Sequence, residues 1–136
     1  MITRPALSHH DAFRILHAAK ADLEKRKKGA AVAVVDPHGE LLAFLRTDTC
    51  RLSCIDVAIN KAYTAAREQG ESKALGDAAK REGFPLTNFG DLRYVTWGGG
   101  IPIHAEGHVV GAVGVSGMSE VEDTAVAQMA VALLGH

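Results

Sequence analysis

Apolar residues recur at helical spacing near the start of the chain. The segment after Ser8 therefore predicts an amphipathic helix with one apolar stripe turned toward a core. Ser8 and Asp11 form a capping box in which Asp replaces the usual Glu. We expect this helix to end at Gly29. The basic cluster EKRKKG at 24–29 fits this end, because cations are favoured at a helix C-terminus. The stripe consists of Ala12, Ile15, Leu16, Ala19 and Leu23.

Two short apolar runs follow and predict an antiparallel hairpin. Residues 30–36 read AAVAVVD, residues 40–46 read ELLAFLR, and the turn sequence DPHG joins them. Pro37 presets a type I turn, and Gly39 supplies the left-handed position after it. Because the first run is apolar on both faces, we expect both sides of the sheet to be covered, at least in part.

The rest of the chain predicts three more helices and a second group of strands. A helical stripe runs through residues 55–66, and residues 71–82 form a shorter and more polar predicted helix. A last helix begins after Ser119, where Glu122 completes a capping box. Residues 84–97, before the second group of strands, hold four of the seven aromatic residues. The order of helix, two strands, two helices, two or three strands and helix indicates an α+β fold, with an antiparallel sheet of about five strands packed with α-helices.

Residues 98–117 hold seven of the 14 glycines, and their spacing excludes the common phosphate-binding loops. No G-x-G-x-x-G lies between a strand and a helix, and the Lys–Ser/Thr pair of a Walker loop is absent. Glu106–Gly107 instead reads as the two-residue turn of a hairpin. Gly111 and Gly114 remove side chains from its second strand, which marks the close approach of a backbone or a ligand.

Composition and charge are ordinary for a globular domain, and they argue against nucleic-acid binding and against a membrane protein. The 136 residues are 47% hydrophobic and 23% charged, and the formal net charge of −1 argues against a nucleic-acid-binding surface. This length predicts a single domain over residues 1–136. No apolar run is long enough for a membrane span, and the start has no signal-peptide pattern. We therefore expect a cytoplasmic protein with no membrane partner.

Neither the cysteines nor the histidines of the glycine-rich hairpin predict a metal site. Cys50 and Cys54 form a lone C-x-x-x-C, which makes no disulfide framework and is a weak zinc motif. In the hairpin register set by Glu106–Gly107, His104 and His108 face opposite sides of the sheet. We expect no metal ion bound by these residues.

Three stretches of the chain resemble a known family. They are AVAVVDPHGELLAFLRTD at residues 31–48, SCIDVAINKAYTAA at 53–66 and GGGIPIHAEGHVVGAVGVSGMSEVED at 98–123. With them, the chain from about residue 8 to residue 134 is similar to the GlcG/HbpS-like haem-binding family and to the C-terminal module of PduO-type corrinoid adenosyltransferases. The resemblance implies a profilin-like fold and a homo-oligomer. An oligomer also fits a last helix that is apolar around much of its circumference.

The members of this family differ in function, so the resemblance leaves more than one function open. Several members bind haem, and some degrade it slowly with peroxide, which makes haem binding with such degradation the first implied function. The alternative is a non-enzymatic accessory protein, or one that binds a small organic acid, associated with a catabolic pathway for small hydroxy acids or diols. A third function is that of an enzyme on such an acid. Whether the chain is an enzyme stays open.

The resemblance places the haem ligand on the first helix, because a histidine of that helix ligates haem in the relatives that bind it. His9, His10 and His17 are the candidates, and Phe13 lies between His10 and His17 on the same flank. The haem iron is the only metal that the resemblance implies. The alternative for each histidine is a solvated helix flank without a ligand.

Seven further residues are candidates for lining a ligand pocket. Arg46 and Asp48 follow the second strand and either hold a carboxylate by a bidentate contact or pair with each other. The aromatic residues of 84–97 either line an apolar slot for the haem ring or anchor their loop to the core. Ser116 is not part of a G-x-S-x-G sequence, so we expect no serine nucleophile there. The seven candidates are Arg46, Asp48, Lys61, Phe89, Trp97, Gly111 and Gly114.

Overall fold

The computed structural model describes residues 1–134, which form four α-helices, one short 3-10 helix and one sheet. The helices are α1 (His9–Arg26), α2 (Cys54–Glu68), α3 (Ser72–Glu82), the 3-10 helix η1 (Leu86–Phe89) and α4 (Glu120–Ala132). The strands are β1 (Ala31–Val35), β2 (Leu41–Arg46), β3 (Gly100–Ala105) and β4 (His108–Ser116). This order confirms the predicted α+β fold.

The sheet has four strands, which corrects the expectation of about five. Residues 84–97 form η1 and irregular turns in place of a further strand. Pro85 has no N–H group to donate to a neighbouring strand, and Gly90 is left-handed with φ 67°. Phe84, Phe89 and Tyr94 pack against one another, and Tyr94 packs against Tyr63 of α2, so they anchor the segment without pairing it to the sheet.

All neighbouring strands run antiparallel, in the order β2-β1-β4-β3. The turn between β1 and β2 has Gly39 in the left-handed region, with φ 91°, and the Asp36 carboxylate accepts the N–H groups of His38 and Glu40. The turn between β3 and β4 is Glu106–Gly107, with φ 52° and 77°. Both predicted turns are therefore confirmed, and the second has the positive φ angles that two-residue hairpins favour.

A bulge in the β3–β4 pair changes which side chains share a face. Strict alternation from the Glu106–Gly107 turn would place Val113 on the face opposite Ile101. In the structure Ile101 pairs with Val113, because the register shifts between Ile103 and His104. One inserted residue moves every later side chain of the strand to the other face. Val113 consequently joins the core that contains Ile101.

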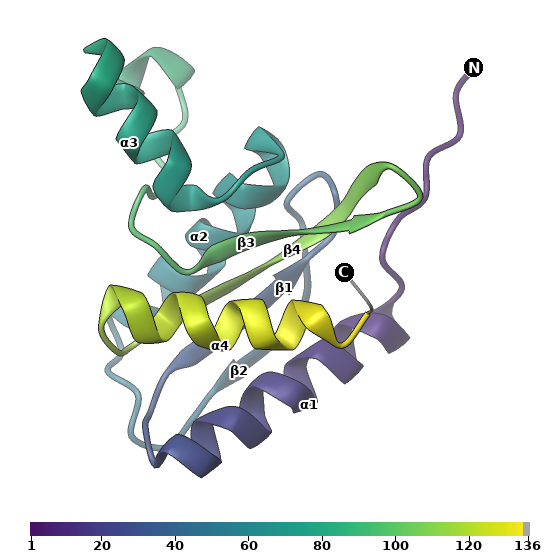
Figure 1. The fold of residues 1–136 in the computed structure, drawn as a ribbon, viewed down its shortest axis with the longest axis vertical. Helices are drawn as coiled ribbons and strands as arrows, with labels where there is room; N and C mark the ends of the chain where they lie inside the picture. The colour runs from purple at the N-terminus through teal and green to yellow at the C-terminus, as the bar shows by residue number, and fades with distance from the viewer. Residues whose placement is uncertain (135–136) are drawn as a thin grey trace.

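Helices cover both faces of the sheet, as the doubly apolar first strand predicted (Figure 1). On one face α1 and α4 lie side by side over a core that includes Val32, Val34 and Ile103. On the other face α2 packs Ala58 and Ala62 against the sheet. All five residues of β1 are buried. A strand covered on both sides needs apolar residues at every position, which explains its sequence.

The predicted signals at the helix ends are largely confirmed. Ser8 and Ser119 cap α1 and α4, and each hydroxyl oxygen accepts an N–H from the third residue after it. α1 ends at Arg26 and not at Gly29, because Lys27 takes the left-handed C-cap conformation with φ 57°. A single non-glycine residue such as Lys27 can adopt this left-handed conformation, whereas a run of such residues would be strained.

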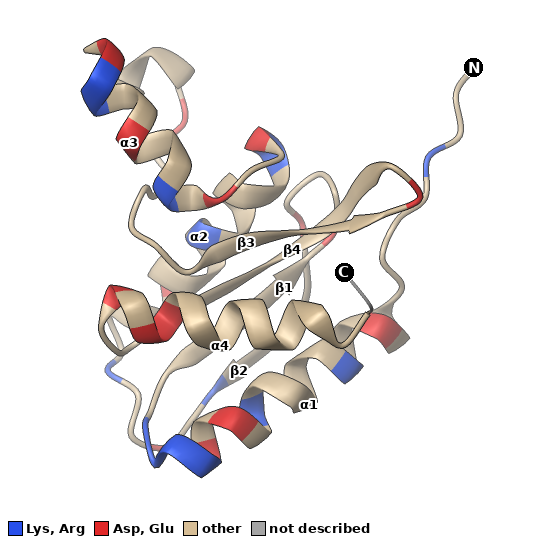
Figure 2. Ribbon diagram, in the orientation of Figure 1, with Lys and Arg blue, Asp and Glu red and all other residues tan. Residues whose placement is uncertain are grey.

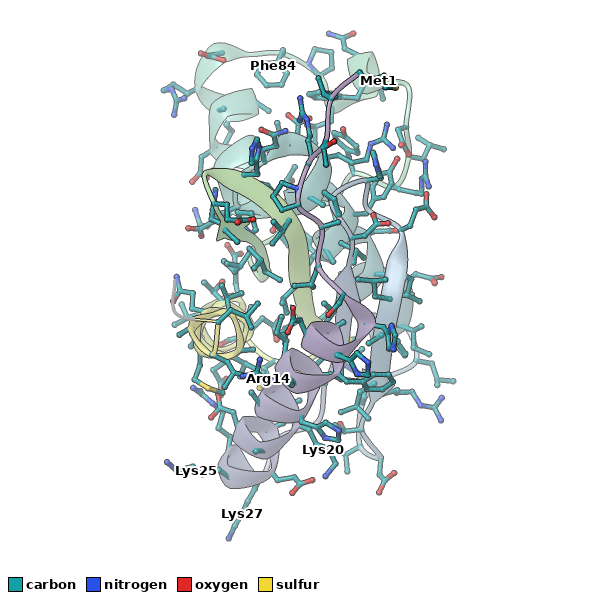
Figure 3. All side chains as sticks on the ribbon, turned by 90° about the vertical axis from the view of Figure 1, so that its right-hand side faces the viewer. Met1, Arg14, Lys20, Lys25, Lys27 and Phe84 are labelled. Carbon is teal, nitrogen blue, oxygen red and sulfur yellow. The ribbon has the colours of Figure 1, made fainter. Side chains whose placement is uncertain are left out.

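Charged residues lie mostly on the helices and the connecting segments and are sparse on the sheet (Figure 2). Arg14, Lys20 and Lys25 of α1 and the C-cap residue Lys27 point into solvent (Figure 3). The acidic residues of α4 are confined to its first turn. Within residues 1–134, no helix is both long and apolar enough to cross a membrane.

Candidate functional site

The first-helix histidines lie on an exposed flank of α1. His9, His10 and His17 are exposed, and the side chain of Phe13 is 50% exposed. The ring centroids of His9 and His10 are 4.2 Å apart, and those of Phe13 and His17 are 6.5 Å apart. The flank therefore places imidazole nitrogens beside an uncovered aromatic ring, while the apolar stripe of α1 stays in the core.

A cleft of about 500 Å³ lies between the start of α2, the start of α4 and the chain at Trp97. The Lys61 ammonium at its floor donates to the backbone oxygen of Val115 at 2.8 Å and to Asp123 Oδ2 at 3.2 Å. The Lys61 and Asp123 side chains are nearly fully buried, with 3% and 4% exposed. Burial raises the pKa of the Asp123 carboxyl, and the Lys61 ammonium opposes part of this rise.

Around this ion pair the cleft offers hydrogen-bond donors and an apolar wall. Ser116 is 6% exposed and borders the cleft, and its hydroxyl makes no hydrogen bond within residues 1–134. Arg51 lies at the rim, and its guanidinium forms no ion pair with the described residues. Trp97, which is 65% exposed, and Met118 supply apolar surface.

The glycine triplet 98–100 lets the chain pass directly over the ion pair. A Cβ on Gly99 would lie 2.5 Å from the Val115 oxygen and 3.0 Å from Lys61 Nζ. A Cβ on Gly100 would collide with the backbone oxygen of Lys61. Close packing, and not phosphate contact, therefore explains why this run contains glycine.

Gly111 and Gly114 also lie where backbones approach closely. A Cβ on Gly114 would collide with the backbone oxygen of Ala58 in α2 and lie 2.6 Å from the Ala62 nitrogen. A Cβ on Gly111 would collide with the backbone oxygen of Val35. This geometry agrees with the expected close packing. Neither glycine borders the cleft, and a role for them in lining a ligand pocket stays a prediction.

Arg46 and Asp48 lie apart from both of these features. They border a shallow cavity of about 210 Å³ at the end of α1 and the end of β2. Both are exposed, and they form no ion pair with each other in the structure. Their proposed contact with a carboxylate also stays a prediction.

The aromatic segment 84–97 is anchored to α2 by polar and aromatic contacts. The Tyr63 hydroxyl donates to the Asp91 carboxylate, and Arg93 donates to both of its oxygens, at 3.0 and 3.1 Å. The Arg93 guanidinium above all, and then the Tyr63 hydroxyl, lower the pKa of the Asp91 carboxyl. The Phe89 and Tyr94 ring centroids are 4.8 Å apart, and Tyr94 packs edge-on against Tyr63. These contacts favour anchoring of the loop over a slot for haem.

The metal-binding residue types are scattered over the described part of the chain. Residues 1–134 contain no group of three His, Cys, Asp or Glu side chains that could hold a metal ion. The strand register pairs His104 with Val109 and Ala105 with His108, so the two histidines lie on opposite faces as expected. Both also border a cavity of about 410 Å³ at the tip of the β3–β4 hairpin. Cys50 and Cys54 are free thiols. Burial, and then the neighbouring Cys54, raises the pKa of the Cys50 thiol, which disfavours a reactive thiolate.

The candidate site residues thus fall into separate places. The histidine flank lies on α1, Lys61 and Trp97 border the cleft, and Phe89 belongs to the loop anchor. Asp123 was not predicted as the partner of Lys61, because acidic residues are common in the first turn of any helix. Ser116 was not predicted as a cleft residue, because no motif marks that serine.

Comparison with known proteins supports the sequence resemblance. An uncharacterized 15.0 kDa protein from the dhaT-dhaS intergenic region of Citrobacter freundii is 38% identical over 124 residues, covering 88% of this chain and 86% of that protein. Protein GlcG of Escherichia coli K12 is 33% identical over 122 residues, covering 85% of each chain.

Solved structures share both the fold and part of the sequence. A double mutant of Streptomyces reticuli HbpS superposes with a TM-score of 0.90 at 29% identity, covering 100% of this chain and 92% of HbpS. A PduOC:heme complex superposes with a TM-score of 0.86 at 29% identity, covering 93% of this chain and 94% of PduOC. The family model described as "Haem degrading protein HbpS-like" matches residues 7–132. This chain therefore belongs to the HbpS-like family.

Proposed function

We propose that this protein binds haem through a histidine of α1 and that it acts as a homo-oligomer. Two comparisons support haem as the ligand: the family is described as haem-degrading, and PduOC has the same fold and was solved in complex with haem. The side chains of α1 support the place at which haem binds. Slow peroxide-dependent degradation of the bound haem is the further activity that we propose.

The observation that carries this proposal is the exposed flank formed by His10, Phe13 and His17. A neutral imidazole is a common axial ligand of haem iron, and an uncovered phenyl ring packs well against a flat aromatic face. His10 and His17 are separated by ~10 Å along the helix axis, so one iron takes only one of them. His9 packs against His10 and is the remaining candidate at that end of the helix.

The flank fits haem as one half of a pocket. Haem needs an apolar slot for its ring as well as an axial ligand, and this chain alone leaves Phe13 half exposed. On the same side of the sheet, Val121 and Met129 of α4 and its C-cap residue Leu133 are exposed. A second copy of the chain packed on this side would supply the missing wall, which links haem binding to assembly.

In this proposal the chain binds, orients and encloses the haem. An imidazole nitrogen of the α1 flank binds the iron, and Phe13 covers part of the ring. Bound haem supplies the iron redox chemistry that a reaction with peroxide requires. The histidine fixes how the ring sits against α1, and the second copy limits the access of water to it.

Haem titration of histidine variants tests the assignment. We expect an absorption band in the violet region when haem is added, and we expect it to weaken or shift when the ligating histidine is replaced. His9, His10 and His17 are replaced by Ala singly and together, and His38→Ala, in the exposed β1–β2 turn, is the matched control. An unchanged spectrum in the triple variant would overturn ligation by α1. The absence of a band in the parent would overturn haem binding, and a band that is stable to peroxide would overturn degradation.

A further inference from the structure

The cleft above the Lys61–Asp123 ion pair has chemistry that haem binding on α1 does not use. It is built from the starts of α2 and α4 and from the glycine-rich segment, and it shares no lining residue with the histidine flank. Its floor contains two nearly fully buried charges, which is an expensive arrangement for a surface cleft. The groups that line it therefore indicate a second binding site.

The floor of the cleft has donors left over, whereas its carboxylate is already engaged. An ammonium group has three N–H bonds, and Lys61 directs them at two acceptors, Val115 and Asp123. Asp123 accepts from Lys61 through Oδ2, and its Oδ1 accepts the N–H of Met118 at 3.0 Å. One N–H of Lys61 is therefore available to a molecule in the cleft.

The Ser116 hydroxyl is the second unused donor. Ser116 is 6% exposed and borders the cleft, yet its hydroxyl has no partner within residues 1–134. Among residues 1–134, Asp22 Oδ2 is the one fully buried side-chain nitrogen or oxygen without a partner, so the unpaired Ser116 hydroxyl is open to the cleft. An acceptor in the cleft would satisfy Ser116 and Lys61 together.

The charged residues at the rim limit which kind of acceptor the cleft can bind. Arg51 adds a positive charge and Glu120 a negative one, so the whole lining has two cations and two anions. Glu120 and Asp123 repel any anion, and they repel a dianion such as phosphate about twice as strongly as a single carboxylate, so the lower charge is favoured. Val57, Met118 and Trp97 offer apolar surface to a short carbon chain.

We propose that this cleft binds a small monocarboxylate. Its carboxylate oxygens accept hydrogen bonds from Lys61, Ser116 and Arg51, and its carbon chain lies against the Trp97 ring. The proposal goes beyond haem binding and does not depend on it, because the two sites use different residues.

Trp97 makes binding in this cleft directly observable, since it is the single tryptophan of the chain. The haem-free protein is titrated with acetate, butyrate and hexanoate, with butyramide as the uncharged comparator and inorganic phosphate as the dianion. We expect butyrate to change the Trp97 fluorescence saturably in the millimolar range, because a ligand with so few atoms has little binding free energy. Butyramide and phosphate should have no saturable effect at the same concentrations.

Three point variants locate the binding. Ser116→Ala and Arg51→Gln should each weaken butyrate binding about tenfold, because each removes a hydrogen bond to a charged group. Arg81→Gln, which changes an exposed arginine at the end of α3, is the matched control and should bind butyrate like the parent. The variant lacking His9, His10 and His17 should also bind butyrate like the parent, so failure of the haem proposal and failure of this one are distinguishable.

Several results would overturn the proposal. These are no saturable change with any carboxylate, equal binding of butyramide, tighter binding of phosphate, or unchanged butyrate affinity in both Ser116→Ala and Arg51→Gln. Arg51 lies at the surface, so Arg51→Gln keeps the test decisive even where Ser116→Ala melts early. Amide chemical shifts of Gly98 and Gly117, which border the cleft, give an independent measure of where butyrate binds.

Discussion

Lys61 and Asp123 form an ion pair of 3.2 Å that joins α2 to α4 with both side chains almost fully buried. Lys61 also donates to the backbone oxygen of Val115, so one ammonium group ties two helices and strand β4 together. Removal of one partner from a buried ion pair leaves an uncompensated charge, which destabilises a protein far more than loss of the whole pair does.

Replacement of Lys61 by Met should destabilise the protein strongly. The Asp123 carboxylate would stay buried without its cation, at a cost of about 3–5 kcal/mol in the free energy of unfolding. The double variant Lys61→Met with Asp123→Leu should recover part of this loss, because it buries no charge. Chemical denaturation at neutral pH measures both. Equal losses in the single and double variants would show that the packing of the lysine stem, and not the charge, is what matters.

The loss in Lys61→Met should also depend on pH with a defined sign. Burial raises the pKa of Asp123 above its ordinary value of 3.8. The folded protein then binds this proton more tightly than the unfolded chain does. Protonation of Asp123 therefore stabilises the folded state in acid, and this stabilisation is lost as the pH rises through the raised pKa. Removing Lys61 raises this pKa further, so the loss should be smaller in mildly acidic buffer than at neutral pH. A loss that grows on acidification would contradict this account.

Most of the fold follows from signals between residues that are close in the sequence. The helical stripes, the Ser8 and Ser119 caps and the Glu106–Gly107 turn each depend on a few neighbouring positions, and each is present in the structure. The number of strands and the bulge after Ile103 depend on which segments pair across the sheet. Local patterns contain no information on such pairing, and those two features were not predicted.

The sequence places Lys61 and Asp123 each on the apolar stripe of a helix, but local sequence patterns do not show that the two residues meet. Lys61 lies on the buried stripe of α2 with Ala58 and Ala62, and Asp123 lies on the buried stripe of α4 with Val126. A charged residue on an apolar stripe is turned toward the core, where a charge is costly unless it is paired. Two opposite charges on such stripes are therefore candidates for an ion pair. The residues are 62 positions apart, so only the tertiary structure shows that they meet.

Gly114→Ala should destabilise the packing of α2 on β4. The added Cβ would collide with the backbone oxygen of Ala58 and lie 2.6 Å from the Ala62 nitrogen, and no side-chain movement relieves a clash with backbone. We expect a loss of about 1–3 kcal/mol in the free energy of unfolding. Gly70→Ala is the matched control, because its nearest neighbouring atom would be 3.8 Å away. Equal melting temperatures for the two variants would contradict close packing at Gly114.

Asp91→Asn should loosen the aromatic loop and change the acid sensitivity of the protein. Hydrogen bonds from Arg93 and then Tyr63 lower the pKa of the Asp91 carboxyl. A lowered folded-state pKa adds stability above the ordinary value of 3.8, and this stability is lost as the pH falls below that value. The variant should therefore melt earlier at neutral pH and lose less on acidification. Asp77→Asn, on the exposed face of α3, is the control, and an identical pH profile for parent and Asp91→Asn would refute the role of Asp91.

The outer face of α4 should be covered by another copy of the chain. Val121, Met129 and Leu133 are exposed there, and the acidic residues of the helix are confined to its first turn (Figure 2). A helix that is apolar on its outer as well as its inner face is normally buried on both sides. Met129→Lys should therefore reduce the assembly to the 14.4 kDa mass of one chain in light scattering at micromolar concentration, whereas Gln128→Lys, also exposed on α4, should leave it intact. A parent protein that already has the mass of one chain would contradict the prediction, because this apolar face would then be stable in water.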